Sequence, residues 1–316
     1  MSRHISNKNE HRIYRFTLVI VAAVMLITGL CQALLAAEAK QKSFKSPEEA
    51  VQALVEAVKK GDTKELIAIF GPESKDLIFS GDKVADKAGR DQFTSAYEEK
   101  HQLVKEGDNK AILIIGQHDW PMPIPLVKQE EAWLFNTKEG SDEILNRRIG
   151  KNELNTIEVC LAYVDAQREY AIKDCDGNRL RDYAQRFAST RGKKDGLYWE
   201  TKEGEGESPM GPLMAKAAKE GYLQFNLSPY HGYYYKILKA QGEHAPGGAY
   251  SYVARGNMMG GFALVAYPAE YGNSGIMTFV VNQDGRVYQK DLGKETKKIA
   301  EAMKLYDPDE TWQQVK

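Results

Sequence analysis

Residues 230–292 decide the fold that this sequence predicts. Residues 230–250 read YHGYYYKILKAQGEHAPGGAY, and residues 260–292 read GGFALVAYPAEYGNSGIMTFVVNQDGRVYQKDL. Strand-like apolar runs, crowded with tyrosines, alternate with Gly, Pro and Asn-Gly-type breaks, which is the pattern of short hairpins in an antiparallel sheet. The segment Asn282–Gly285 is predicted to be a hairpin turn. Because the stretch carries no nucleophile motif, metal-ligand cluster or phosphate loop, it predicts a fold rather than a chemistry.

The tyrosines at the start of this stretch cannot all face the same way. Successive side chains of a strand point to opposite faces, so Tyr233 and Tyr235 are expected to lie opposite Tyr234. One face is expected to be core, and the other an exposed aromatic patch that contacts a partner or ligand. Tyr230 and Tyr234 are therefore candidate contact residues.

A long amphipathic helix is predicted just before the sheet. Its apolar residues recur at three- and four-residue steps, namely Leu154, Ile157, Leu161 and Val164. The helix is expected to begin near Asn152 or earlier and to end after Ala171, and a short helix over residues 294–303 closes the chain. Residues 151–316 are thus predicted to form one helix-plus-antiparallel-sheet domain.

Residues 40–150 are predicted to form a separate α+β domain. Ser46 and Pro47 begin a helix that Gly61 ends, and Asp62 caps a second helix. A third helical segment is expected to carry three residues on one side, namely Phe93, Tyr97 and Val104. Helices followed by strands are the order expected of an α+β fold.

Two strands are expected to complete this first domain. They cover residues 111–115 and residues 126–135, and the proline-rich segment 120–125 between them is expected to be an extended connection or edge. Trp120 and Trp133 are candidate residues for a ligand pocket, although aromatic side chains on sheets more commonly fill core. Further acid–base groups for such a pocket are Asp82, Asp86 and Asp119.

His231 is the best single candidate for chemistry or ligand contact in the chain. With His244, and with Glu243 or Asp284, it has the side chains that a metal site needs, but the spacing does not fix such a site. The alternative is a hydrogen-bonded structural histidine at the start of a strand.

The segment after the long helix has the oxygen side chains of a weak calcium site. They are Asp174, Asp176, Asn178 and Asp182. Arg179 and Gln185 occupy the positions at which an EF-hand loop has Gly and a bidentate Glu. The alternative is therefore a polar, Asx-rich turn, and no other cofactor is predicted.

The first 39 residues have the features of an export signal. Four basic residues precede an apolar run, and small residues at Ala37-Glu38-Ala39 resemble a cleavage site. The alternative is an uncleaved anchor, since residues 16–37 are long enough to span a bilayer. The basic flank places the body outside the cytoplasm in both cases, in the periplasm or cell envelope, or anchored to the inner membrane through the leader alone.

Charge and cysteine content limit the possible functions. The whole chain has a net charge of −1, and removing residues 1–39 leaves −3, which excludes the basic face of a nucleic-acid-binding protein. Cys160 and Cys175 would lie about 20 Å apart on an unbroken helix, whereas a disulfide needs Cα atoms within about 7 Å. We expect a buried Cys160 and a solvated Cys175, with a disulfide as the alternative if the chain folds back after Tyr170.

Three resemblances follow from these segments. The opening SPEEAVQALVEAVKKGDTKELIAIF resembles the first helices of cone-shaped folds of the nuclear-transport-factor and cystatin type, and the long helix with its sheet resembles pilin-like domains. Nearly the whole chain beyond the leader resembles an exported bacterial family catalogued as domain of unknown function 2950. The segments that carry this resemblance are WPMPIPLV, EILNRRIGKNEL, YVDAQREYA, PYHGYYYKIL, HAPGGAY, GGFALVAYPAEYG and MTFVVNQDG. The family implies a compartment and an architecture, but no mechanism.

Two functions remain open at this point. The first is a non-enzymatic envelope protein that binds a partner protein or small ligand through exposed aromatic residues. The second is a hydrolase-type enzyme that uses a pocket in the first domain or the surroundings of His231. The chain has no G-x-S-x-G or H-E-x-x-H motif, which favours the first hypothesis.

Overall fold

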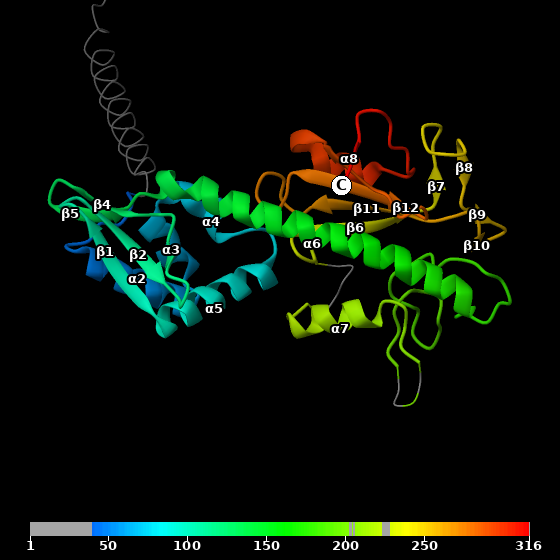
Figure 1. Ribbon diagram of the computed structural model, residues 1–316, viewed down its shortest axis with the longest axis horizontal. Helices are drawn as coiled ribbons and strands as arrows, with labels where there is room; N and C mark the ends of the chain where they lie inside the picture. Colours follow the sequence, from blue (N-terminus) through cyan, green and yellow to red (C-terminus); the bar gives the residue numbers. More distant parts are fainter. Residues whose placement is uncertain (1–39, 202–203, 205, 223–227, 316) are drawn as a thin grey trace, which may run out of the picture.

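The computed structural model describes residues 40–201, 204, 206–222 and 228–315 and has a mixed α+β fold (Figure 1). The predicted leader, residues 1–39, lies outside the described residues. Two hydrophobic cores form, one from residues between Phe44 and Phe135 and one from residues between Val159 and Tyr306. A long helix, α6, runs from beside the first sheet to the second sheet.

The first core begins with helices whose ends follow the predicted caps. These elements are α2 (Pro47–Lys60), α3 (Thr63–Phe70), η1 (Pro72–Ser74), α4 (Lys75–Ile78) and α5 (Lys83–Glu99). Ser46 Oγ accepts a hydrogen bond from the Glu49 amide, and Gly61 ends α2 with a φ of 63°. Asp62 caps α3 by accepting from the Glu65 amide. The side-chain oxygens satisfy amide groups that a helix N-terminus leaves without partners.

The first sheet is antiparallel. Its strands are β1 (His101–Glu106), β2 (Lys110–Ile115), β3 (Trp120–Pro121), β4 (Leu126–Gln129) and β5 (Ala132–Phe135). The main order is β1-β2-β4-β5, and β3 pairs with β2. The single strand predicted over residues 126–135 was wrong, because Glu130 takes a left-handed φ of 55° and folds the segment into a hairpin. Val104, predicted on a helix, lies in β1.

Helix α6 (Thr137–Lys173) is the longest element of the described chain. Its 37 residues span about 55 Å, and its start at Thr137 agrees with the predicted start near Asn152 or earlier. The expected domain boundary at residue 150 falls inside this helix, so α6 is continuous from the first core to the second. None of the helices in the described part of the chain combines the length and the apolar composition that a bilayer crossing needs.

The second sheet is antiparallel, as predicted, and its strand order is β14-β13-β12-β11-β6. Its strands are β6 (Tyr233–Leu238), β11 (Ala263–Pro268), β12 (Met277–Asn282), β13 (Val287–Asp291) and β14 (Gln313–Gln314). Short strands lie outside it: β7 (Ala240–Gln241), β8 (Tyr250–Ser251), β9 (Val253–Ala254) and β10 (Asn257–Met258). Two further helices are α7 (Gly211–Lys219) and α8 (Thr296–Ala302), the latter preceded by η2 (Gly293–Glu295). The turn after Asn282 joins β12 to β13, as predicted.

Helices cover both faces of this sheet. The Tyr235 hydroxyl lies 3.4 Å from Thr156 Oγ1 of α6, whereas Lys236 Nζ donates to the Ala300 carbonyl of α8. Tyr234, on the face of Lys236, lies under Lys297 of α8, with 5.7 Å between the ammonium and the ring centre. The predicted alternation of the tyrosines is confirmed. The predicted open aromatic patch was wrong, because α8 partly covers Tyr234 and α6 covers the opposite face.

Two polar side chains fasten the first core to the second sheet. Arg148 of α6 donates to the Asp76 carbonyl at 2.8 Å, to the Leu77 carbonyl at 2.6 Å and to the Asn273 side chain. Asn273 in turn donates to the Phe79 carbonyl at 2.6 Å. Burial lowers the pKa of Arg148, and nearby acidic groups oppose this change. The short α4 segment is therefore held by residues distant in the sequence.

Candidate functional site

A buried carboxylate, Asp82, lies where the first core meets the second. One oxygen caps α5 by accepting from the Val84 amide at 3.0 Å and the Ala85 amide at 3.1 Å. The other accepts from the Tyr222 hydroxyl at 2.8 Å and the Gly232 amide at 3.0 Å. Asp82 is only 1% exposed. Charge-assisted hydrogen bonds of this kind are stronger than neutral ones, so Asp82 joins α5 to the segments that precede β6.

His231 lies next to this carboxylate in a strained turn. The turn is closed by the Tyr230 amide bonding to the Tyr233 carbonyl at 2.9 Å and by the reverse bond at 3.2 Å. His231 and Gly232 both have left-handed φ values, 52° and 77°, as a two-residue type I′ turn requires. A Cβ on Gly232 would lie 2.6 Å from the Asn152 side chain. Because glycine has no Cβ, Gly232 can adopt the left-handed φ and can lie close to Asn152. His231, by contrast, is held in a backbone conformation that is uncommon for a residue with a side chain.

The imidazole of His231 is largely removed from water. Its side chain is 17% exposed, and its Nε2 lies 3.2 Å from Glu220 Oε2. The two atoms are not aligned as a hydrogen bond, and Nε2 has no hydrogen-bond partner among the described residues. The ring packs on Tyr230, with 4.1 Å between ring centres.

We call five neighbouring residues the junction cluster: Asp82, Glu220, Tyr222, Tyr230 and His231. Burial shifts the pKa of three of them. Burial lowers the pKa of His231, and the Glu220 charge opposes this change. Burial also raises the pKa of Tyr222, and Asp82 adds to that increase. The pKa of Tyr230 is raised by burial and by Glu220. A neutral imidazole beside a carboxylate can accept a proton, so this cluster has the groups for acid–base chemistry.

We expect the junction cluster to make the protein less stable in mild acid. The ordinary pKa of histidine is 6.5 and that of folded His231 is lower. Above about pH 6.5 both states are neutral, but as the pH falls further the unfolded state binds the proton first. The free energy of unfolding should therefore fall until the pH reaches the folded pKa. The charged groups that act on His231 are Glu220, Lys216, Asp82 and Lys151.

Urea unfolding of wild type and His231→Gln between pH 7 and pH 5 measures this effect, and the variant should show the smaller loss. His244→Gln is the control of opposite sign. Asp307 raises the pKa of His244, so that histidine stabilises the fold below about pH 6.5 and loses the effect as the pH rises through its folded pKa. Equal acid dependence in wild type and His231→Gln would contradict the assignment.

The structure separates the other predicted acid–base and metal groups. Asp86 accepts from the Ser80 hydroxyl at 2.6 Å, and Asp119 pairs with Lys100 at 2.6 Å. His244 lies 3.0 Å from Asp307 instead of approaching His231. Within the described ranges, no group of three or more His, Cys, Asp or Glu side chains is arranged to hold a metal ion.

The predicted aromatic contact residues lie in different surroundings. Trp133 is buried in the first core, where its backbone pairs with Phe44. Trp120 is half-buried beside Arg147, with 5.8 Å between the guanidinium and the ring centre. Tyr230 and His231 belong to the junction cluster, and Tyr234 lies under α8. These residues therefore do not form one aromatic surface.

The predicted calcium loop forms a set of Asx-type turns. The Asp174 carboxylate accepts from the Arg179 amide at 3.1 Å, and Asp176 accepts from the Asn178 amide at 3.2 Å. Asp182 accepts from the Asn178 side chain at 3.2 Å, and burial raises the pKa of Asp182. These contacts are those of the polar-turn alternative, and the calcium site stays a prediction.

Both cysteines of the described chain are free thiols. Cys160 is buried, as predicted, and Cys175 is half-buried rather than fully solvated. Burial raises the pKa of Cys160 to about 12, and it raises the pKa of Cys175 as well. Because the thiolate is the reactive form, neither position has the environment of a nucleophile.

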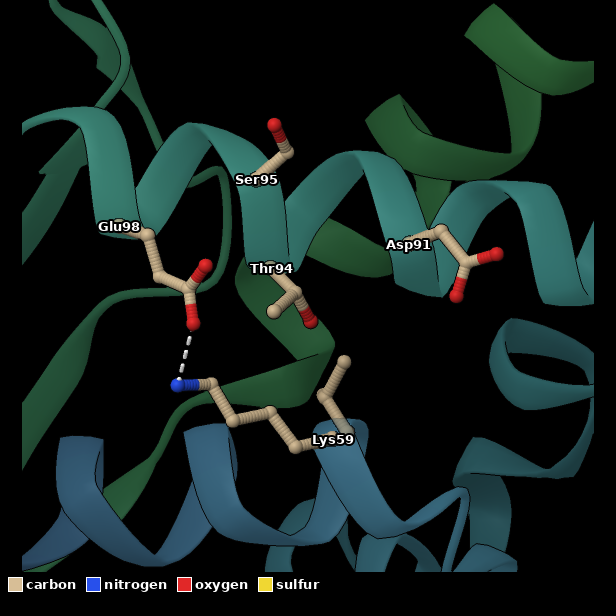
Figure 2. Close-up of a pocket in the computed structure, with 6 residues that line it drawn as sticks. Lys59, Asp91, Thr94, Ser95 and Glu98 are labelled. Carbon is tan, nitrogen blue, oxygen red and sulfur yellow. Dashed lines mark ion pairs between the residues drawn. The ribbon is translucent and has the colours of Figure 1, made fainter.

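A surface pocket of about 260 Å³ lies between α2 and α5 (Figure 2). It is lined by Val58, Lys59, Asp91, Thr94, Ser95 and Glu98. An ion pair of 2.6 Å joins Lys59 to Glu98 across it. Ligand sites are mostly apolar with a few convergent polar groups. This polar lining, far along α5 from Asp82, does not match that description.

The outer face of α6 exposes large aliphatic side chains in one line. Leu154, Leu161 and Ile172 are 66%, 43% and 74% exposed. Seven and eleven residues separate them, and both spacings return to nearly the same side of a helix. Four exposed charged residues alternate with them: Lys151, Glu158, Asp165 and Arg168. We call these seven residues the α6 stripe.

Sequence reasoning named Asp82, Tyr230 and His231 separately, but it missed Glu220, Tyr222 and the exposed face of α6. Asp82 precedes the helical residues Lys83 and Val84, so a capping role could have been predicted from the local sequence. Its bond to Tyr222 joins residues 140 positions apart, and no local pattern indicates it. On α6, the residues Leu154 and Leu161 were read as the buried face, although they point outward.

Comparison with known sequences and structures places the chain in a family. Neither a curated protein nor a solved structure matched it. Residues 41–315 match the model of a family described as "Protein of unknown function (DUF2950)". The match covers both cores, all of α6 and the junction cluster. The chain therefore belongs to the DUF2950 family.

Proposed function

We propose that this protein is exported to the cell envelope and works there as a non-enzymatic binding or assembly protein. The observation that carries the proposal is the α6 stripe. Helix α6 exposes Leu154, Leu161 and Ile172 along one line, with charged residues between them. A row of apolar and charged residues at this spacing is typical of a helix face that pairs with another helix. The basic and apolar leader of residues 1–39 supports export.

We propose further that the two cores correspond to two domains, residues 40–150 and 151–316. A cone-like first domain is supported by the helices that pack against an antiparallel sheet. A pilin-like second domain is supported by the long helix α6 on a five-stranded antiparallel sheet. In this arrangement α6 is shared by both domains, and its outer face is available for binding.

A photo-cross-linking amino acid at Leu161 tests the proposed contact surface in intact host cells. We expect an adduct of defined mass in the envelope fraction, because Leu161 lies near the middle of the α6 stripe. The matched control is Gln52, an exposed residue of α2 away from the stripe, which should give no such adduct. Absence of an adduct at Leu161, or retention of the protein in the cytoplasm, would refute the proposal.

A hydrolase-type enzyme is the second candidate. The observation that favours it is the strained, desolvated His231 beside Glu220, since strained residues and shifted pKa values concentrate at functional sites. Hydrolysis of ester or amide substrates by the wild type, lost in His231→Gln with the fold retained, would establish this candidate in place of the first.

A further inference from the structure

The α6 stripe has the spacing of a helix-pairing seam. From Lys151 to Ile172 the exposed positions follow alternating steps of three and four residues, which is the spacing of the a and d positions of a coiled coil. In Figure 1, α6 runs along the second sheet, and the stripe residues are all exposed. From Leu154 to Ile172 the steps are four, three, four, three and four residues, so the spacing is the same in both directions along the helix.

We propose that the α6 stripe binds the α6 stripe of a second copy of this chain in antiparallel orientation. The inference rests on the binding function proposed above and names the partner. A symmetric spacing allows two identical helices to face each other about a two-fold axis, so that each contact occurs twice. In this pairing Leu154 of one copy lies opposite Ile172 of its partner, and Glu158 lies opposite Arg168.

Charge decides the orientation of the pair. A parallel, in-register pair would place all four charged residues of the stripe against their own copies, at Lys151, Glu158, Asp165 and Arg168. The antiparallel pair instead places Glu158 opposite Arg168 at both ends, and opposite charges across an interface select the correct partner and register. Leu161 lies opposite Asp165 near the axis, next to the Leu161 of the other copy.

Other antiparallel registers satisfy fewer groups. If the two-fold axis lies closer to the start of α6, Lys151 faces Arg168 of the other copy, or Ile172 faces no residue of the other stripe. Arg168 remains available for an intermolecular contact although it donates to the Gln283 carbonyl at 2.8 Å, because a guanidinium has five N–H donors. A single helix seam is a small interface, so the dimer should be weak and should depend on protein concentration.

Sedimentation velocity on the protein purified from its host, in the processed form that the host makes, tests the proposal. Wild type should shift from monomer to dimer as its concentration rises. Glu158→Arg alone and Arg168→Glu alone should each weaken dimerisation by at least about tenfold, since each variant faces two like-charge contacts. Mixing the two variants in equal amounts should restore dimers, because in the mixed dimer each residue 158 again faces a residue 168 of opposite charge.

The mixing experiment distinguishes loss of the proposed contact from misfolding, because mixing two misfolded variants would not restore the fold of either. Lys298→Glu is the matched control, a charge reversal at an exposed position of α8, and should dimerise as wild type does. A wild type that stays monomeric at all concentrations, unaffected single variants, or a mixture that fails to dimerise would overturn the proposal. An adduct between Leu161 and a different protein would preserve the binding function and refute self-association.

Discussion

Asp82→Ala is expected to lower the free energy of unfolding by about 3–5 kcal/mol, from the loss of a helix cap together with two buried donors left without an acceptor. The substitution removes the cap of α5 and leaves the Tyr222 hydroxyl and the Gly232 amide without their acceptor. A lost cap costs about 1 kcal/mol, and each buried donor left unsatisfied costs about 1–3 kcal/mol. Asp82 is almost fully buried, so water cannot easily replace the lost oxygens.

Asp62→Ala is the matched control for this change. Asp62 also caps a helix, by accepting from the Glu65 amide at 3.0 Å, but it lies on the surface. Its loss should cost only about 1 kcal/mol. Urea unfolding of both variants gives the comparison, and the difference between them measures the contacts that Asp82 makes to Tyr222 and Gly232. Equal losses in the two variants would show that these contacts contribute nothing.

Gly140→Ala is expected to destabilise the protein by about 1–3 kcal/mol or more, as overpacking does. A Cβ at position 140 would lie 2.2 Å from the Pro123 carbonyl oxygen and 2.7 Å from the Ile124 amide nitrogen. These are backbone atoms, so no side-chain rotation relieves the overlap. Alanine is favoured over glycine within a helix by about 1 kcal/mol, but here the steric term is the larger and decides the sign.

Gly150→Ala gives the opposite result on the same helix. A Cβ there would have no neighbour within 4 Å, so only the helix preference acts, and a gain of about 0.5–1 kcal/mol is expected. Thermal unfolding of the two alanine variants, followed by circular dichroism, should therefore move the midpoint in opposite directions. A Gly140→Ala protein as stable as wild type would show that the segment around Pro123 can move away from α6.

The capping residues explain why the first helices could be predicted from the sequence. Ser46, Pro47, Gly61 and Asp62 act within a few residues of the backbone groups that they satisfy. The same holds for the turn after Asn282, whose side chain accepts from the Asp284 amide at 3.2 Å. Local hydrogen bonds of this kind are encoded by short patterns, and the structure follows them.

Predictions were less accurate where one sequence pattern is compatible with two structures. Residues 126–135 were predicted as one strand, but four polar residues separate its apolar ends, and the left-handed Glu130 turns the run into a hairpin. The predicted apolar positions of α6 do form a helix, and two of them, Ile157 and Val164, pack in the second core. The buried face was wrong at Leu154 and Leu161, which are exposed. Tyr163 and Val164 are buried, whereas Leu161 points outward. A helix that crosses between two cores has no single buried face along its length, so periodicity cannot select one.

The junction cluster and the α6 stripe were decided by tertiary structure. Asp82 meets Tyr222 and His231 only because α5 and the turn before β6 are brought together, and Arg148 fixes the same junction through the carbonyls of α4. The sequence by itself determined the α+β class, the antiparallel second sheet, the helix ends and the family, since these rest on local bonds and short repeats. Contacts between residues far apart in the chain decided which helix and sheet faces are buried. They also decided that Asp82 is buried and that Leu154 and Leu161 are exposed. Short patterns do not record such contacts.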